Sequence, residues 1–219
     1  MLRRRAKLPV LAEIAGPAEG ARTWSLRRQD FAALEGVLPR LAERRVVLVT
    51  GQGEAPSVAA IALAAAAVVA GRGTILVECD LAQPRLAAQV GLPAAPGLHE
   101  YLRWEAEPAD VIQPVVLGGP AAGGAEDPLI CVCAGRPSSK AETLLGLQSF
   151  SHMVEKLRGA YELVLLAGAS PSEELDAFAA AAHQADAVVA ALGKGEARKA
   201  PKAVSRLPIP ALGAIAIES

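Results

Sequence analysis

Aromatic residues are scarce in this sequence. Phe, Trp and Tyr make up 3% of its 219 residues, whereas hydrophobic residues make up 52%. The core must therefore be built from alanine, valine and leucine, and alanine contributes little buried surface per residue. The length suits one α/β domain and leaves no room for a second full core.

An excess of either charge is also missing. The chain has 22 basic and 23 acidic residues, which gives a formal net charge of −1. Nucleic-acid-binding domains are usually strongly basic with clustered Lys and Arg, so the composition argues against a nucleic-acid partner. A basic run near the start, Arg3–Arg5 with Lys7, is short and is interpreted as a solvated terminus.

Long hydrophobic runs are absent as well. The longest apolar run, Val58–Ala70, is mostly alanine and too short to span a bilayer. The apolar stretch Leu8–Ala15 is interrupted by Pro9 and Glu13, which is not the pattern of a secretory signal. We therefore expect a cytoplasmic protein.

Cysteine is rare, and its three positions form no disulfide framework. Cys79, Cys131 and Cys133 fit a reducing compartment. Cys131 and Cys133 lie two residues apart on an expected strand, so their side chains share a face. The histidines are scattered along the chain, so no metal site is expected there.

Short apolar segments alternate with helical patterns along the chain. Because these segments are apolar at consecutive positions, they are typical of strands buried on both faces. The expected strands are Val46–Thr50, Thr74–Glu78, Leu129–Cys133, Leu163–Leu166, Ala187–Leu192 and Ala211–Ile217. Strands of this kind separated by helices predict an α/β fold, with a mostly parallel central sheet and helices on both faces.

Three segments have helical character. Ser57–Ala70 is an alanine-rich helix that should end at Gly71. The stretch Trp24–Leu41 carries Phe31, Leu34 and Leu38 on one stripe. The clearest helix runs from about Glu142 to Arg158, and its apolar face consists of Leu147, Phe150, Val154 and Leu157.

The domain organisation follows from these segments. Residues 1–44 form an N-terminal segment and helix, and residues 45–219 form the α/β domain, so the chain is a single domain overall. The stretch 118–128 is rich in Gly, Pro and Ala and predicts an exposed, mobile loop.

The loop after the first core strand is the first place to look for a ligand, because ligands collect at the carboxyl ends of parallel strands. It carries Gly51 and Gly53 and leads directly into the Ser57–Ala70 helix. Backbone N–H groups and a helix N-terminus could cradle an anion there. A tight strand-to-helix turn needs the same glycines, and this segment alone does not separate the two interpretations.

The chain from this loop through Ile75–Leu86 resembles the bacterial tyrosine kinases of capsular and exopolysaccharide synthesis (BY-kinases), relatives of the MinD/ParA ATPases. That family has a loop ending Gly-Glu-Gly-Lys-Ser-Thr, an Ala/Leu-rich helix, and a strand ending Asp-x-Asp-Leu-Arg-x-Pro. Counting back from Asp80 places the family's phosphate-binding lysine at Pro56 and its preceding glycine at Ala55. Its magnesium-ligating Ser/Thr falls at Ser57 or Val58.

Later segments extend the resemblance over nearly the whole chain. Residues 131–150 are similar to the family's Pro-Ala-Gly to Pro-x-Glu-Leu-Leu segment, and Tyr161–Leu166 is similar to its Walker B strand. Leu212–Ile215 is similar to its closing Leu-Gly-Val-Val. The resemblance implies a P-loop NTPase-like fold of the MinD/ParA/BY-kinase type.

The resemblance also implies a nucleotide site. Its loop residues would be Gly51, Gly53, Ser57 and Asp80, which would hold ATP or ADP, with Ser57 and Asp80 on magnesium. Any catalytic role would fall to Asp80 and Glu78. Lys140, Lys194 or Lys199 could supply a replacement ammonium, although a solvated surface lysine is the commoner situation. Glu78 and Asp80 could instead share a cation or cap the next turn.

Three elements of the family's chemistry are missing together. Pro56 stands in place of the lysine, Ala167 in place of the Walker B aspartate, and no tyrosine cluster closes the chain, which contains only Tyr101 and Tyr161. Glu78 and Ala82 also replace the first aspartate and the arginine of the second motif. Phosphoryl transfer in this fold depends on such charges, so efficient ATP hydrolysis or tyrosine phosphorylation is not expected.

Three functions remain open at this stage. The leading one is a non-catalytic protein that docks on a membrane polysaccharide co-polymerase or its adaptor, at the inner face of the plasma membrane. The second is a weakly active nucleotide-binding ATPase or tyrosine kinase of the same pathway. The third is a dinucleotide-binding protein in which Glu78 holds a ribose hydroxyl.

The family also assembles into homo-oligomers through a helix with the pattern Glu-x-x-Arg-x-x-Arg. Glu19 and Arg22 match the first half of this pattern, but Ser25 stands in place of the second arginine. The sequence therefore retains only part of the family's assembly motif.

Overall fold

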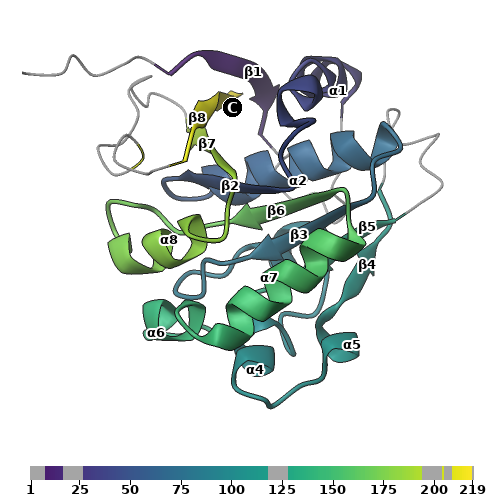
Figure 1. Ribbon diagram of the computed structural model, residues 1–219. Helices are drawn as coiled ribbons and strands as arrows, with labels where there is room; N and C mark the ends of the chain where they lie inside the picture. The colour runs from purple at the N-terminus through teal and green to yellow at the C-terminus, as the bar shows by residue number, and fades with distance from the viewer. Residues whose placement is uncertain (1–7, 17–26, 118–127, 194–203, 205–208, 219) are drawn as a thin grey trace, which may run out of the picture.

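A single mixed sheet forms the centre of the protein (Figure 1). The computed structural model describes residues 8–16, 27–117, 128–193, 204 and 209–218. Within these ranges the sheet has eight strands in the order β1-β8-β7-β2-β6-β3-β5-β4. In chain order they are β1 (Val10–Ala15), β2 (Val46–Gly51), β3 (Thr74–Glu78), β4 (Gln113–Val115), β5 (Leu129–Val132), β6 (Leu163–Ala167), β7 (Ala187–Leu192) and β8 (Ala211–Glu218).

Every neighbouring pair of strands is parallel except β4 with β5. The six expected strands all form, so the predicted α/β fold with a mostly parallel sheet is confirmed. Two strands were not predicted, and both lie at edges of the sheet. β4 has only three residues and contains Pro114, and β1 lies in the stretch interrupted by Pro9 and Glu13. Edge strands need fewer apolar residues because one side is unpaired, which weakens their sequence signal.

Helices cover both faces of the sheet (Figure 1). In chain order they are α1 (Arg28–Glu35), α2 (Ala55–Val69), α3 (Leu86–Val90), α4 (Leu98–Leu102), α5 (Pro108–Val111), α6 (Ala141–Leu145), α7 (Gln148–Ala160) and α8 (Leu175–Ala182), with a short 3-10 helix at Leu38–Leu41. α1, α2 and α3 share the core on one face, and α4 to α8 share the core on the other. None of the helices within the described ranges is long and apolar enough to cross a membrane.

The alanine-rich helix α2 is the centre of the first core. It packs on β2, β3, β6 and β7, and α1 covers its outer side. A helix that is apolar around most of its circumference is expected to be buried, and α2 is buried from Ala55 to Val68. The predicted stripe on Trp24–Leu41 is confirmed, because Leu34 is buried while Phe31 and Leu38 pack against the same core, although α1 ends at Glu35 and Leu38 begins the separate 3-10 helix.

The segment before residue 45 contributes to the sheet itself. β1 pairs in parallel with β8, with Glu13 opposite Ala216 and Ile14 opposite Ile217. Ala12 and Ile14 are buried in the same core as α2. The described part of residues 1–44 is therefore continuous with the fold of residues 45–219.

The predicted helix from Glu142 to Arg158 is wrong in one respect, because it is two helices. α6 ends at Leu145, and α7 begins at Gln148. Leu147 between them has an extended backbone (ψ 145) and is 38% exposed, so it does not belong to the buried face. Gly146 is the C-cap residue of α6 and keeps a right-handed helical backbone (φ −78, ψ −10). The other three face residues, Phe150, Val154 and Leu157, are buried as expected.

Candidate functional site

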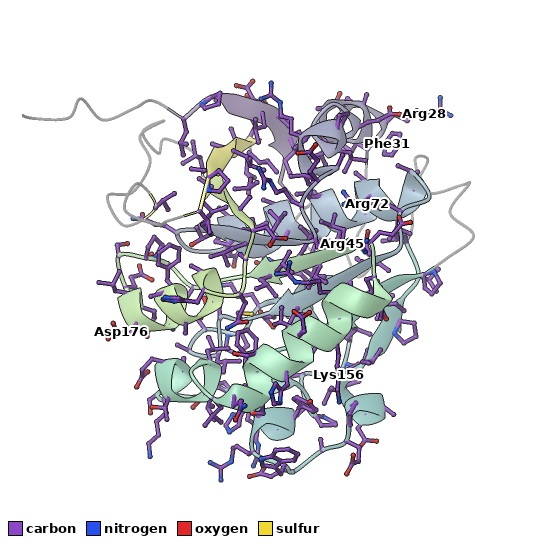
Figure 2. The ribbon with its side chains drawn as sticks, viewed as in Figure 1. Arg28, Phe31, Arg45, Arg72, Lys156 and Asp176 are labelled. Carbon is purple, nitrogen blue, oxygen red and sulfur yellow. The ribbon has the colours of Figure 1, made fainter. Side chains whose placement is uncertain are left out.

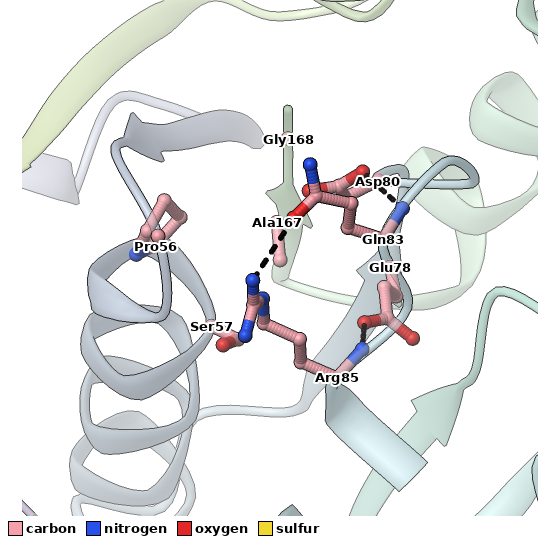
Figure 3. Close-up of a pocket in the computed structure, with 9 residues that line it drawn as sticks. Pro56, Ser57, Glu78, Asp80, Gln83, Arg85, Ala167 and Gly168 are labelled. Atoms are coloured by element: carbon pink, nitrogen blue, oxygen red, sulfur yellow. Dashed lines mark hydrogen bonds between the residues drawn. The ribbon is translucent and has the colours of Figure 1, made fainter. Parts of the chain in front are cut away.

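The site predicted from the sequence lies where β2, β3 and β6 end. Register places Ala167 opposite Val49 on one side and opposite Glu78 on the other. A small pocket opens at these strand ends, and six of its lining residues were singled out from the sequence: Gly53, Pro56, Ser57, Glu78, Asp80 and Ala167. The remaining lining residues, Gln83, Arg85 and Gly168, were not (Figure 3).

The backbone geometry explains why glycine stands at each of the two loop positions, Gly51 and Gly53. A Cβ on Gly51 would clash with the backbone carbonyl of Ala191 on the neighbouring strand β7. Gly51 therefore permits close packing of β2 on β7, and it does not line the pocket. Gly53 has φ 58 with open space around it, so its role is the left-handed backbone of the turn.

The first turn of α2 satisfies its own polar groups. Glu54 is the N-cap residue, and Pro56 sits within the first two positions of the helix, where proline is tolerated. The Ser57 hydroxyl donates to the Glu54 carbonyl oxygen at 3.0 Å. This hydroxyl is the predicted magnesium ligand, and here it is turned back to the helix backbone.

Glu78 at the end of β3 is a buried structural carboxylate. Its Oε1 accepts the backbone N–H of Arg85 at 2.5 Å and of Leu86 at 2.7 Å, and its Oε2 accepts that of Ala134 at 3.0 Å. The side chain thus caps the start of α3 and joins it to the segment after β5. Burial raises the pKa of Glu78, and the three backbone hydrogen bonds oppose that rise.

Asp80 caps the turn that follows β3. Its Oδ1 accepts the backbone N–H of Gln83, three residues on, at 2.9 Å. Burial raises its pKa, and hydrogen bonds and the Arg85 charge partly oppose this effect. Of the two possibilities left open by the sequence for Glu78 and Asp80, the geometry favours capping. Among the described residues, no group of three or more His, Cys, Asp or Glu side chains could hold a metal ion.

A cation that the sequence analysis missed lies in this pocket. The Arg85 guanidinium reaches from the start of α3 toward the first turn of α2 (Figure 3). Its Nη1 forms an ion pair with Glu54 at 3.1 Å, and its Nη2 donates to Gln83 at 3.0 Å. The Nε atom is buried without a hydrogen-bond partner. The one sequence signal was a charged residue in the loop after the Asp80 motif, and no family motif marks that position.

The pocket is too small for a phosphate group. Its volume is about 10 Å³, which is roughly the space of one water molecule. Glu54 pairs with the Arg85 guanidinium, and the Glu78 and Asp80 carboxyl groups line the same pocket, so the local charge is unfavourable for an anion. Ala167 contributes no polar group, and its backbone carbonyl accepts the N–H of Cys79 at 2.7 Å.

The other predicted residues are not brought to this pocket. Lys140 is exposed and does not line it. Lys194 and Lys199 lie outside the described residues, as do Glu19, Arg22 and Ser25 and most of the 118–128 loop. Cys131 and Cys133 are both buried in the core on the α2 face, and this agrees with their predicted shared face.

Comparison with known sequences identifies no relative. No protein-family model matches the chain, and a search of curated proteins finds no significant match.

Comparison with solved structures gives several strong similarities. The chimerical protein CapA2B2 matches with a TM-score of 0.77 at 17% identity, over 97% of this chain and 95% of that one. The BceF tyrosine kinase domain matches with a TM-score of 0.74 at 20% identity, over 96% of this chain and 93% of that one. The kinase domain of the Escherichia coli tyrosine kinase ETK matches with a TM-score of 0.75 at 17% identity, over 96% and 91%.

A more distant similarity connects the fold to P-loop ATPases. The septum site-determining protein MinD of Pyrococcus horikoshii, in complex with Mg-ADP, matches with a TM-score of 0.54 at 15% identity, over 78% of this chain and 81% of that one. The expected fold class is thereby confirmed. The chain has the P-loop NTPase fold in the form found in bacterial tyrosine kinase domains.

Proposed function

We propose that this protein is a catalytically inactive relative of the BY-kinases that acts by binding other proteins. One observation carries the proposal. The phosphate position at the N-terminus of α2 is filled by the protein's own side chains, and the remaining volume of about 10 Å³ accommodates no phosphate. Replacement of the lysine by Pro56 and of the aspartate by Ala167 removes the charges that phosphoryl transfer needs.

Two polar side chains that a magnesium nucleotide would use are already engaged in the fold. The Ser57 hydroxyl donates to Glu54, and both Glu78 oxygens accept backbone N–H groups. Binding a magnesium nucleotide would break these hydrogen bonds and the Arg85–Glu54 ion pair. Losing the hydrogen bonds of the buried Ser57 and Glu78 side chains would cost about 1–3 kcal/mol each, whereas the Arg85–Glu54 ion pair is partly exposed and contributes little.

The partner we propose is a membrane polysaccharide co-polymerase or its adaptor, in capsule or exopolysaccharide synthesis or export. The kinase domains with this fold supply the motivation, since the BY-kinase family works in that pathway. The protein would then act as a regulatory or scaffolding component at the inner face of the membrane, without using ATP.

A calorimetric titration of ATP and ADP, with and without magnesium, tests the loss of nucleotide binding. We expect no heat of binding up to millimolar nucleotide, while a BY-kinase domain titrated in parallel binds. Micromolar, magnesium-dependent binding would overturn the proposal. The docking role is tested by sedimenting the protein with vesicles that carry the co-polymerase, and failure to co-sediment in excess of bare vesicles contradicts it.

A second candidate function is weak nucleotide binding, and Arg85 is the observation that favours it. The guanidinium lies beside the first turn of α2, near the position of the missing lysine, and its Nε has no partner. If Arg85 exchanged Glu54 for a phosphate, it could supply the absent positive charge.

Two variants separate these candidates. Glu54→Gln removes the ion-pair partner and frees the guanidinium, and Arg85→Gln removes the cation. Nucleotide binding that appears or strengthens in Glu54→Gln and disappears in Arg85→Gln supports the second candidate. Absence of binding in the wild type and in both variants supports the non-catalytic role. The dinucleotide alternative has little support in the geometry, because both Glu78 oxygens already accept backbone N–H groups and the side chain is only 2% exposed.

A further inference from the structure

A second and much larger concavity lies at the opposite ends of the strands. Its volume is about 440 Å³, within the range of roughly 300–1,000 Å³ typical of small-molecule sites. Leu38, Ala42 and Ala70 form its apolar walls, and Arg45, Arg72 and Glu162 supply its polar groups. The two arginines project from neighbouring positions on this side of the molecule (Figure 2).

Its position follows from the parallel sheet. Arg45 directly precedes β2, Arg72 lies two residues before β3, and Glu162 directly precedes β6. The concavity therefore lies at the amino ends of these strands, whereas the filled phosphate position lies at their carboxyl ends. The six residues of β2 separate the two places by roughly 20 Å.

Arg72 is held rigidly in this concavity. Its Nη2 lies 3.2 Å from the carbonyl oxygen of Leu41, 3.1 Å from that of Arg44 and 3.0 Å from that of Glu162. This joins the end of the 3-10 helix to the beginnings of two strands. A guanidinium fixed in this way loses little conformational entropy when it binds a ligand.

Arg45 brings a second positive charge next to the first. Its Nη1 donates to the Tyr161 carbonyl oxygen at 3.3 Å, and the ion pairs of the described residues include neither Arg45 nor Arg72. Burial lowers the pKa of Arg72, Glu162 opposes this effect, and the Arg45 charge adds to it. Arg45 thus also contacts the segment before β6, and its exposed guanidinium adds a positive charge beside that of Arg72.

We propose that this concavity binds a small anion, a phosphate or carboxylate group carried on an apolar body. The anionic group would lie between Arg45 and Arg72, where it relieves the repulsion of two guanidinium groups and gains charge-assisted hydrogen bonds. The apolar body would lie against Leu38, Ala42 and Ala70. The Glu162 carboxylate limits the negative charge that the site accepts.

Titration of phenyl phosphate into the full chain tests this proposal, with inorganic phosphate as the probe that lacks an apolar body. Binding is followed by amide chemical shifts, which also report where the probe binds. We expect shifts in residues 38–45, 70–74 and 161–163, and weaker binding of inorganic phosphate. Shifts confined to residues 52–58, or no binding of phenyl phosphate at millimolar concentration, would overturn the proposal.

Three single substitutions should change the affinity for phenyl phosphate in different ways. Arg45→Gln should weaken phenyl phosphate binding about five- to tenfold, because an exposed charge-assisted contact is lost. Glu162→Gln should strengthen it about two- to threefold, because a repulsive carboxylate is removed. Lys156→Gln, an exposed lysine on α7 that changes the net charge as Arg45→Gln does, should change it by less than about twofold.

These variants avoid Arg72, whose loss could unfold the strand ends. Equal effects of Arg45→Gln and Lys156→Gln would show that only net charge matters, and the proposed site would be rejected. Weaker binding in Glu162→Gln would contradict it equally.

Discussion

Replacement of Glu78 by alanine should destabilise the fold. The position corresponds to the first aspartate of the kinase motif, so a vestigial catalytic role would predict little effect on stability. In this structure the carboxylate instead accepts three backbone N–H groups, from Arg85, Leu86 and Ala134. Glu78→Ala removes both acceptor oxygens, and with them all three hydrogen bonds, at a residue that is 2% exposed.

The expected loss of stability in Glu78→Ala is the difference between two opposing contributions. Three hydrogen bonds to a charged acceptor contribute roughly 1.5–3 kcal/mol each, which sums to about 5–9 kcal/mol. Removing the carboxylate also removes the cost of burying its charge, which is several kcal/mol. We therefore expect the free energy of unfolding to fall by about 2–4 kcal/mol. Glu78→Gln keeps one acceptor oxygen and should cost less, about 1–2 kcal/mol.

The assay is urea unfolding at pH 7, followed by far-ultraviolet circular dichroism and by tryptophan fluorescence. With a slope of about 2–3 kcal/mol per molar, Glu78→Ala should lower the midpoint by about 1 M. Asp80→Ala is the matched control, since Asp80 caps only an exposed turn, and it should cost about 1 kcal/mol or less. Equal midpoints for Glu78→Ala and the wild type would refute the structural role of Glu78.

The pH dependence gives an independent check of the same carboxyl group. Burial raises its folded-state pKa above the ordinary value of 4.5, so the folded protein holds this proton more tightly than the unfolded chain does. The stabilising contribution is therefore largest below pH 4.5 and declines as the pH rises through the folded pKa. The stability of the wild type relative to Glu78→Gln should therefore be greatest below pH 4.5 and should decline as the pH rises through the folded pKa.

Two further predictions concern other parts of the fold. Gly135→Ala should lower the free energy of unfolding in urea by more than about 2 kcal/mol, because φ is +86 and a Cβ would clash with the Glu100 carboxylate. Gly53→Ala, at φ +58 in open space, should lower it by only about 1 kcal/mol. Equal losses for the two variants would contradict the packing argument. For Asp186, burial raises the pKa, but hydrogen bonds from the Val46 and Arg45 N–H groups and from Arg158 lower it by more, so the folded-state pKa lies below the ordinary value. The stabilisation by Asp186 is therefore present above about pH 4 and is lost as the pH falls through the folded pKa. Asp186→Asn should flatten the acid limb of a thermal-unfolding profile, and an unchanged limb would refute this.

Much of the fold could be predicted from the sequence because its signals are local. Six buried strands can be recognised in the sequence as short apolar runs, and a parallel sheet with helices on both faces is the arrangement that buries both sides of such runs. The replaced side chains can be read from the sequence as well, and the loss of phosphoryl transfer that they imply stays a prediction. Pro56 and Ala167 remove a cation and a carboxylate whatever the surrounding structure, since neither side chain can replace those groups.

The failures of prediction lie where the deciding contacts are weak or remote. The helix predicted from Glu142 to Arg158 is interrupted because Leu147 takes an extended backbone, and helical periodicity cannot report one such residue. β1 was missed because it is completed by pairing with β8, at the other end of the chain.

The sequence by itself determined the fold class, since the apolar runs and helical patterns that define it are local, and it showed which residues stand at the positions of the family's charged groups. Only the tertiary structure decided what the remaining polar residues do. Glu78 is a structural cap because Ala134, 56 residues away, donates to it. Arg85 reaches the first turn of α2 because the sheet brings β3 beside α2, and Arg45, Arg72 and Glu162 meet because three strands begin at the same edge.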